Sequence, residues 1–62
     1  MIGRVIIVRR SGRRGRAGEL APSESYARVV ATSCMAITVD VCGVLIRVSP
    51  EHTRRAPKAV QP

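Results

Sequence analysis

Arginine is the residue type in this sequence best suited to chemistry, and the chemistry that it indicates is phosphate binding. Residues 9–16 read Arg-Arg-Ser-Gly-Arg-Arg-Gly-Arg, so the arginines of this segment are Arg9, Arg10, Arg13, Arg14 and Arg16. A guanidinium donates two parallel hydrogen bonds to one phosphate, and the intervening glycines let the backbone follow an irregular surface. Such contacts place a protein on nucleic acid without reading its sequence. We expect these five arginines to contact phosphates, and the absence of interleaved aromatic residues favours DNA over RNA or a single strand.

The overall charge points to the same class of partner. Eleven Lys and Arg residues stand against four Asp and Glu residues, which gives a formal net charge of +7. The second basic cluster contains Arg54, Arg55 and Lys58. A distribution of this kind favours nucleic acid or an anionic membrane surface as the partner, and the alternative is a solvated basic segment with no specific target.

Residues for catalysis or metal binding are few and scattered. The acidic residues are Glu19, Glu24, Asp40 and Glu51. His52 is the single histidine, and we expect it to be solvated in a mobile tail rather than to act as a general base. Cys34 and Cys42 form no CxxC pair and have no histidine at ligand spacing. We therefore expect no enzyme, no metal and no cofactor, and we expect two reduced thiols in a cytoplasmic protein, with a disulfide as the alternative.

Residues 36–48 predict the clearest structural element, a β-hairpin that turns at Cys42 and Gly43. Apolar residues alternate on either side of this two-residue turn, which ends in glycine. One face of the hairpin then carries the β-branched residues Ile37, Val39, Val41, Val44, Ile46 and Val48. We expect this face to pair with a second copy or a partner protein. Asp40 and Arg47 are expected to lie diagonally across the opposite face.

The rest of the chain predicts a single small unit, residues 1–62, of mainly β structure. We expect an antiparallel hairpin or meander with strands at about 2–8, 26–32, 36–41 and 44–49. Residues 9–25 are expected to form a flexible basic loop and linker, because glycines interrupt both periodicities. Residues 50–62, which contain three prolines, are expected to form a disordered tail. The short apolar side chains predict a unit that is not independently stable.

A membrane-spanning segment is the rival interpretation of residues 29–46. These eighteen residues hold one charge, Asp40, and Arg28 and Arg47 flank them. A central aspartate costs roughly 2.5–3.5 kcal/mol on insertion scales, and the segment alternates instead of being uniformly apolar. The hairpin is therefore preferred, and a small membrane peptide remains the alternative.

Three segments together resemble the carboxyl-terminal part of the transposase accessory protein (orfA/TnpA type) of insertion sequence 66-family elements. They are residues 13–20 (RRGRAGEL), 25–30 (SYARVV) and 37–48 (ITVDVCGVLIRV). The resemblance implies a truncated form that lacks the family's helix-turn-helix, so that base recognition is missing. It leaves nonspecific phosphate contacts by Arg13, Arg14 and Arg16, and a hairpin that serves as an assembly surface for other transposition proteins.

The sequence thus favours a non-catalytic, DNA-associated accessory protein, or a fragment of one, linked to transposition. One alternative is an interaction module whose hairpin edge adds to the sheet of a partner protein, with the arginines serving solubility. A small membrane peptide that spans residues 29–46 and an unselected reading frame of GC-rich DNA are two further interpretations.

Overall fold

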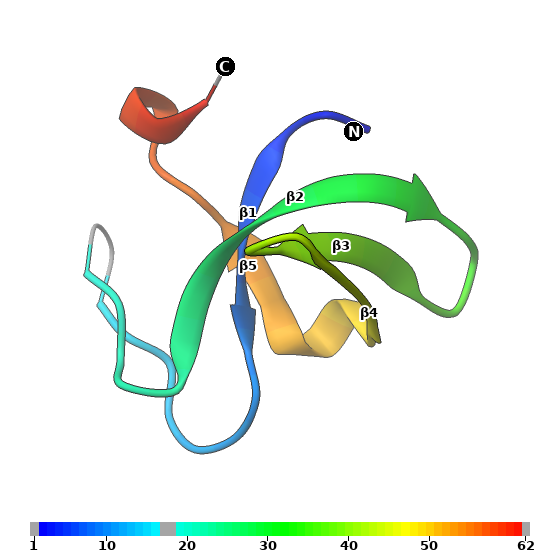
Figure 1. Cartoon of the computed structure of the whole chain (residues 1–62). Coiled ribbons are helices and arrows are strands. Elements are labelled where there is room, and N and C mark those ends of the chain that lie inside the picture. The colour runs from blue at the N-terminus through cyan, green and yellow to red at the C-terminus, as the bar shows by residue number, and fades with distance from the viewer. Residues whose placement is uncertain (1, 17–18, 62) are drawn as a thin grey trace.

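The computed structural model describes residues 2–16 and 19–61, which form one antiparallel sheet of five strands (Figure 1). The strands are β1 (Val5–Arg9), β2 (Glu24–Thr32), β3 (Ile37–Val41), β4 (Val44–Val48) and β5 (Thr53–Arg55). Two single turns of 3-10 helix, η1 (Pro50–His52) and η2 (Lys58–Val60), precede and follow β5. The mainly β fold predicted by the sequence is confirmed.

The strands lie in the order β4-β3-β2-β1-β5, so the last strand is the neighbour of the first. β2 is the longest strand and bends strongly across the molecule, with a bulge between Val29 and Ala31 (Figure 1). Its first half pairs with β1 and its second half with β3. A strand order of this kind assigns no function by itself, because one fold can host many unrelated functions. Function must therefore be argued from the site.

The predicted hairpin is confirmed in register and in turn. The paired residues are Val41 with Val44, Val39 with Ile46, and Ile37 with Val48. Cys42 and Gly43 have φ angles of 54° and 84°, the left-handed values that a two-residue hairpin turn of this type requires. The backbone N–H of Gly43 donates to Oδ1 of Asp40 at 2.7 Å, which ties the turn to the end of β3.

The apolar face of this hairpin lies against the rest of the molecule, and the expectation of a partner face is therefore wrong. The core consists of the buried residues Ile6, Val8, Ala27, Val29, Ile37 and Val39, with Val41, Ile46 and Val48 packed against it. Only Val44, at the hairpin tip, stays largely exposed. Because β1 and β2 supply the opposite wall of the core, the face is satisfied within one chain.

The segment after residue 49 is ordered as far as residue 61, which corrects the prediction of a disordered tail; Pro62 lies outside the described residues. Its strand, β5, pairs with the free edge of β1. Ala56 is buried. The Gln61 side chain accepts a hydrogen bond from the N–H of Val5 at 2.9 Å through Oε1 and donates one to the carbonyl oxygen of Val5 at 2.7 Å through Nε2. These partners lie some fifty residues away in sequence, so no local pattern reveals them.

Residues 29–46 form parts of three strands, β2, β3 and β4, and not one helix. Within residues 2–16 and 19–61, no helix has the length and apolar character needed to cross a membrane. The first strand also begins later than predicted, at Val5 instead of residue 2, and β2 begins two residues earlier, at Glu24.

Replacing Val39 by alanine tests the packing of this core. Val39 is fully buried (0% exposed), so Val39→Ala should lower the free energy of unfolding by about 2 kcal/mol through lost apolar burial and the cavity left behind. Val44→Ala removes the same atoms from a side chain that is 59% exposed and should cost less than about 0.5 kcal/mol. Urea unfolding followed by circular dichroism measures both, and equal losses would contradict the assignment of the core.

Candidate nucleic-acid interface

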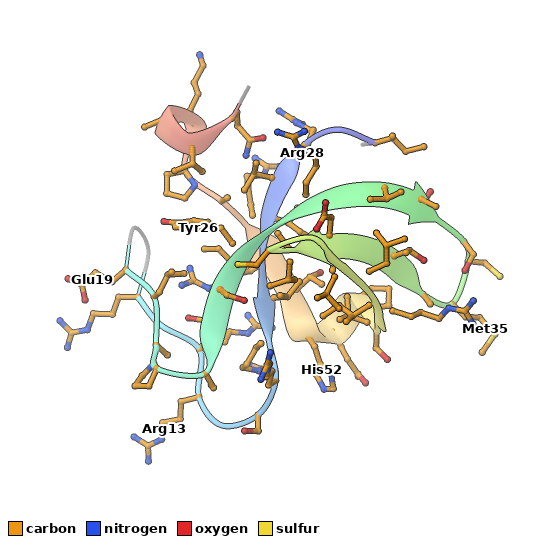
Figure 2. All side chains as sticks on the ribbon, in the orientation of Figure 1. Arg13, Glu19, Tyr26, Arg28, Met35 and His52 are labelled. Atoms are coloured by element: carbon orange, nitrogen blue, oxygen red, sulfur yellow. The ribbon has the colours of Figure 1, made fainter. Side chains whose placement is uncertain are left out.

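The five predicted phosphate-binding arginines lie at the end of β1 and along the loop that connects β1 to β2. Arg9 is the last residue of β1 and is half-buried, whereas Arg10, Arg13, Arg14 and Arg16 are exposed. Figure 2 shows the Arg13 side chain extending outward from this loop, away from the sheet. The structure thus brings the five residues together on one connection, which we call the arginine loop (residues 9–16 and 19–23 as described).

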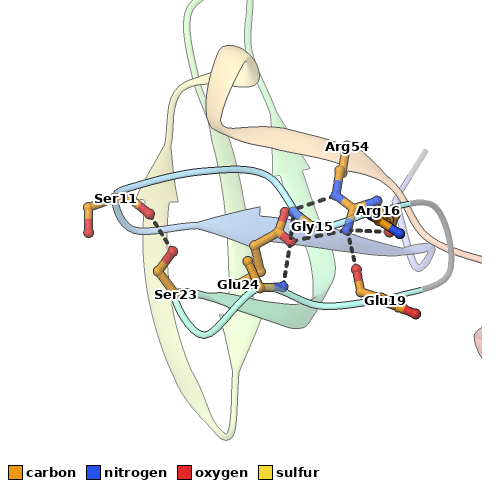
Figure 3. Close-up of polar contacts among 8 residues, drawn as sticks. Ser11, Gly15, Arg16, Glu19, Ser23, Glu24 and Arg54 are labelled. Atoms are coloured by element: carbon orange, nitrogen blue, oxygen red, sulfur yellow. Dashed lines mark hydrogen bonds and ion pairs between the residues drawn. The ribbon is translucent and has the colours of Figure 1, made fainter.

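Glu24, the first residue of β2, closes the base of the arginine loop (Figure 3). It is the one buried charged residue among those that the structure describes. Its Oε1 accepts hydrogen bonds from the backbone N–H groups of Gly15 at 2.6 Å and Ala21 at 2.9 Å. A single carboxylate oxygen therefore joins two points of the loop that lie on either side of residues 17–18.

Arg54 of β5 completes this closure from the opposite side. Its Nε donates to Oε2 of Glu24 at 2.8 Å, and its Nη2 donates to Oε1 at 3.1 Å. The same Nη2 donates to the backbone carbonyl oxygens of Glu19 at 2.6 Å and Arg16 at 3.3 Å (Figure 3). The guanidinium thus binds the Glu24 carboxylate and the loop backbone at once.

The protonation of this pair follows from these contacts. The hydrogen bond from Arg54, followed by that from the N–H of Ala21, lowers the pKa of Glu24 to about 2, although burial acts in the opposite direction. The hydrogen bond to Glu24 raises the pKa of Arg54. Both groups are therefore charged throughout the physiological pH range.

Further hydrogen bonds hold the two sides of the loop together. The N–H of Arg10 donates to the carbonyl of Ser23 at 3.1 Å, and the Ser23 hydroxyl donates to the carbonyl of Ser11. The N–H of Glu19 donates to the carbonyl of Arg16 at 2.9 Å. The sequence predicts a flexible segment over residues 9–25, whereas its described residues make these defined contacts and both of its ends belong to strands.

The arginine loop presents positive charge that no carboxylate of the described residues neutralises. The ion pair between Arg54 and Glu24 is the one salt bridge found within residues 2–16 and 19–61. The five loop arginines therefore have no described acidic side chain within ion-pair distance. In this arrangement they can act as donors to an external anion, with the planar fork that suits a phosphate.

Two surface hollows extend the cationic surface. One of about 460 Å³ is lined by Arg4, Arg54, Arg55 and Lys58, with apolar residues and Gln61. The other, of about 290 Å³, has Arg9, Arg10, Arg47 and His52 among its lining residues. Of the described residues that line either hollow, none is acidic. The second basic cluster of the sequence does not act as one unit. Arg54 forms the internal ion pair with Glu24, while Arg55 and Lys58 line the larger hollow.

The other candidate residues do not assemble into a site. Cys34 and Cys42 are free and exposed, and His52 is exposed at the end of η1. In the described part of the chain, no three His, Cys, Asp or Glu residues lie close enough to hold a metal ion. Sequence reasoning missed Glu24 and Arg54, since thirty residues separate them and no local spacing connects them.

Comparison of the chain with protein-family models, with curated proteins and with solved structures finds no match. The resemblance to the insertion sequence 66-family accessory protein therefore stays a prediction. What the protein does must be inferred from the arrangement of the arginine loop and its anchor.

Glutamine in place of Glu24 tests the anchor through pH. The folded-state pKa of Glu24 is about 2 against 4.5 for the free group, so the folded protein binds fewer protons than the unfolded chain between these values. The stability that Glu24 contributes is complete above pH 4.5 and is lost as the pH falls toward 2. Glu24→Gln should be less stable than the wild type at pH 7, and the difference should shrink across this window.

Urea unfolding at pH 7, 5, 4, 3 and 2 gives this comparison, with the exposed Glu51→Gln as the matched control. The control should follow the wild-type profile. A Glu24→Gln variant that lost stability with falling pH as steeply as the wild type would contradict the assignment.

Alanine at position 15 tests the close approach that the anchor imposes. A Cβ on Gly15 would lie 2.7 Å from the backbone nitrogen of Ala21 and closer still to the carbonyl oxygen of Glu19. Gly15→Ala should therefore cost about 1–3 kcal/mol of stability or displace the loop. The adjacent exposed substitution Arg14→Ala should change the free energy of unfolding by less than about 0.5 kcal/mol. Thermal and urea unfolding of both variants provide the measurement, and equal stability of the two would refute this packing.

Proposed function

We propose that this protein binds nucleic acid, with duplex DNA as the preferred form, through its phosphate groups and without reading base sequence. The observation that carries the proposal is the arginine loop itself: five arginines without a described carboxylate partner lie on a connection whose base the Glu24–Arg54 ion pair closes. Each such arginine that reaches a phosphate releases a condensed counterion, and this release provides most of the affinity in nonspecific binding.

The anchored base of the loop favours this role over that of a solvated basic segment. A free arginine-rich chain loses backbone and side-chain freedom when it binds, and that loss opposes binding. Here the hydrogen bonds of Gly15 and Ala21 to Glu24, and those of Arg54 to the loop carbonyls, already fix much of the backbone. The exposed guanidiniums thus lose less freedom when they bind a phosphate.

The remaining charge supports the same partner. The net charge of +7 attracts a polyanion over a distance of about one Debye length, roughly 8 Å at physiological ionic strength. Cationic residues also line both surface hollows, so a long polyanion that contacts the loop meets further positive charge beside it.

The biological role that we propose is that of a non-catalytic accessory protein of a mobile element, acting in the cytoplasm. This part rests on the resemblance of residues 13–20, 25–30 and 37–48 to the insertion sequence 66-family accessory protein. Within that resemblance, Arg13, Arg14 and Arg16 are the residues that contact DNA.

A salt titration of duplex DNA binding tests the proposal. If the five loop arginines each neutralise one phosphate, the slope of log K against log salt concentration should be about −4.5. Arg13→Gln/Arg14→Gln should reduce the magnitude of the slope to about 2.7 and weaken binding equally for unrelated duplex sequences. Fluorescence anisotropy with labelled duplexes at several salt concentrations measures these quantities.

The matched control is the single variant Arg28→Gln, which removes one charge from an exposed position of β2 that lines neither hollow, and it is compared with Arg13→Gln. Its slope should stay close to that of the wild type. Absence of binding at low salt, or an equal change of slope in Arg13→Gln and Arg28→Gln, would contradict the proposal for the arginine loop.

A further inference from the structure

The outer edge of β4 is an open sheet edge with unpaired backbone groups. β4 pairs with β3 alone and lies at the end of the strand order. Val41 and Val44 flank the two-residue turn, and residues in these positions exchange backbone hydrogen bonds. In an antiparallel ladder only every second pair does so, and the next hydrogen-bonded pair is therefore Val39 with Ile46. The peptide groups of Leu45 and Arg47 therefore face away from β3, where no strand among the described residues receives them.

The two edges of the sheet differ in how they are protected. The edge at β5 is only three residues long, and short length is a device that blocks strand addition. β4 has five residues, and its side chains Val44 and Leu45 are 59% and 62% exposed. An additional strand therefore has one edge available, that of β4.

A groove that is lined by β4, the end of β1 and η1, together with Ser25 and Val41, defines the chemistry of what fits beside this strand. It is the hollow of about 290 Å³, which Ile46, Arg47 and Val48 line on the β4 side. Val8 contributes to its apolar surface, and cationic or polar groups come from Arg9 at the end of β1, from Arg10 after it and from His52 of η1. None of the described residues around it is acidic. The groove therefore suits a chain that offers apolar and anionic groups together.

We propose that the β4 edge binds an extended acidic peptide segment of a partner protein as an additional antiparallel strand. The partner backbone bonds to the free peptide groups of Leu45 and Arg47, which is the β-augmentation mode of peptide recognition. Side chains alternate in a strand, so apolar residues of the partner enter the groove while its carboxylates meet Arg9 and Arg10. A second copy of this chain fits less well, because two chains of charge +7 repel and each has only isolated acidic residues.

Binding of a synthetic probe tests this inference. The probe is the labelled peptide acetyl-Asp-Val-Glu-Val-Asp-Val-amide, titrated by fluorescence anisotropy at physiological ionic strength. Leu45→Pro removes an outward-facing N–H without touching the bonds between β3 and β4, since proline is tolerated at this kind of edge position. It should weaken binding about tenfold, whereas the matched control Leu45→Thr should stay within about twofold of the wild type.

A second arm leaves the protein unchanged and so does not depend on the folding of a variant. The backbone amides of the probe that face β4 alternate with amides that face away from it. N-methylation of the amides that face β4 should weaken binding about tenfold, and N-methylation of the amides that face away should leave binding unchanged. The amide version of the probe, with Asn and Gln for Asp and Glu, should bind more weakly than the acidic version. The proposal would be overturned if the acidic probe did not bind. It would also be overturned if the two methylated probes, the two Leu45 variants, or the amide and acidic probes gave equal binding.

Two measurements separate this proposal from other occupants and from the proposed function. If sedimentation shows a dimer that Leu45→Pro converts to monomer, the edge pairs with a second copy and the acidic-peptide proposal is wrong; a wild-type monomer supports it. Leu45→Pro should bind duplex DNA with the wild-type salt slope, because the substitution removes no charge. Arg13 and Arg14 do not line the groove, so Arg13→Gln/Arg14→Gln should weaken DNA binding and leave peptide binding unchanged, which distinguishes a failure of one proposal from a failure of the other.

Discussion

The ion pair between Glu24 and Arg54 is the interaction on which the arrangement of the molecule depends. It joins the start of β2 and the arginine loop that precedes it to the middle of β5, which lies thirty residues further along the chain. A buried carboxylate is tolerated only when it is paired and its oxygens accept hydrogen bonds, and here Arg54, Gly15 and Ala21 all donate to it. The pair also gives the arginines two different roles, because Arg54 donates inward while the loop arginines remain available to an external anion.

The small size of the chain explains why such a contact matters. The chain has few large side chains, and its core consists of valine, isoleucine and alanine. The one sheet must therefore curl, so that strands of the same sheet enclose the core from two sides. β1 lies between β2 and β5, and its residues Ile6, Ile7 and Val8 are all buried. Ile7 shares its face with Tyr26 and Arg54 across the strand pairs, the face on which the ion pair holds the loop. The loop is therefore part of the packing of the domain as well as its candidate binding surface.

What the sequence predicts well is local, and what it misses depends on partners distant in the chain. The hairpin at Cys42 and Gly43 can be predicted to the register, because alternation and turn chemistry are encoded within thirteen residues. β5 cannot, since Thr53, Arg54 and Arg55 show no apolar alternation and form a strand only because β1 has a free edge. The apolar hairpin face is evident from its pattern, but a pattern cannot tell whether such a face is buried within the chain or against another molecule. The exposed arginines of the site can likewise be predicted from composition, whereas their anchor, Glu24 with Arg54, requires the fold.

The two proposed binding surfaces differ in physical character and meet at two residues. Attachment to DNA through the arginine loop rests on side-chain charge, which salt screens, while strand addition at β4 rests on backbone hydrogen bonds, which salt affects much less. Arg9 and Arg10 belong to the loop and also line the groove beside β4. A phosphate and a partner carboxylate would therefore compete for the same guanidiniums. By thermodynamic linkage this competition is reciprocal, so DNA bound to the loop weakens the docking of an acidic strand by the same factor by which the strand weakens DNA binding. On the two proposals together, binding of one anionic partner would favour release of the other, and the coupling would be located at the end of β1, where Arg9 and Arg10 belong to both surfaces.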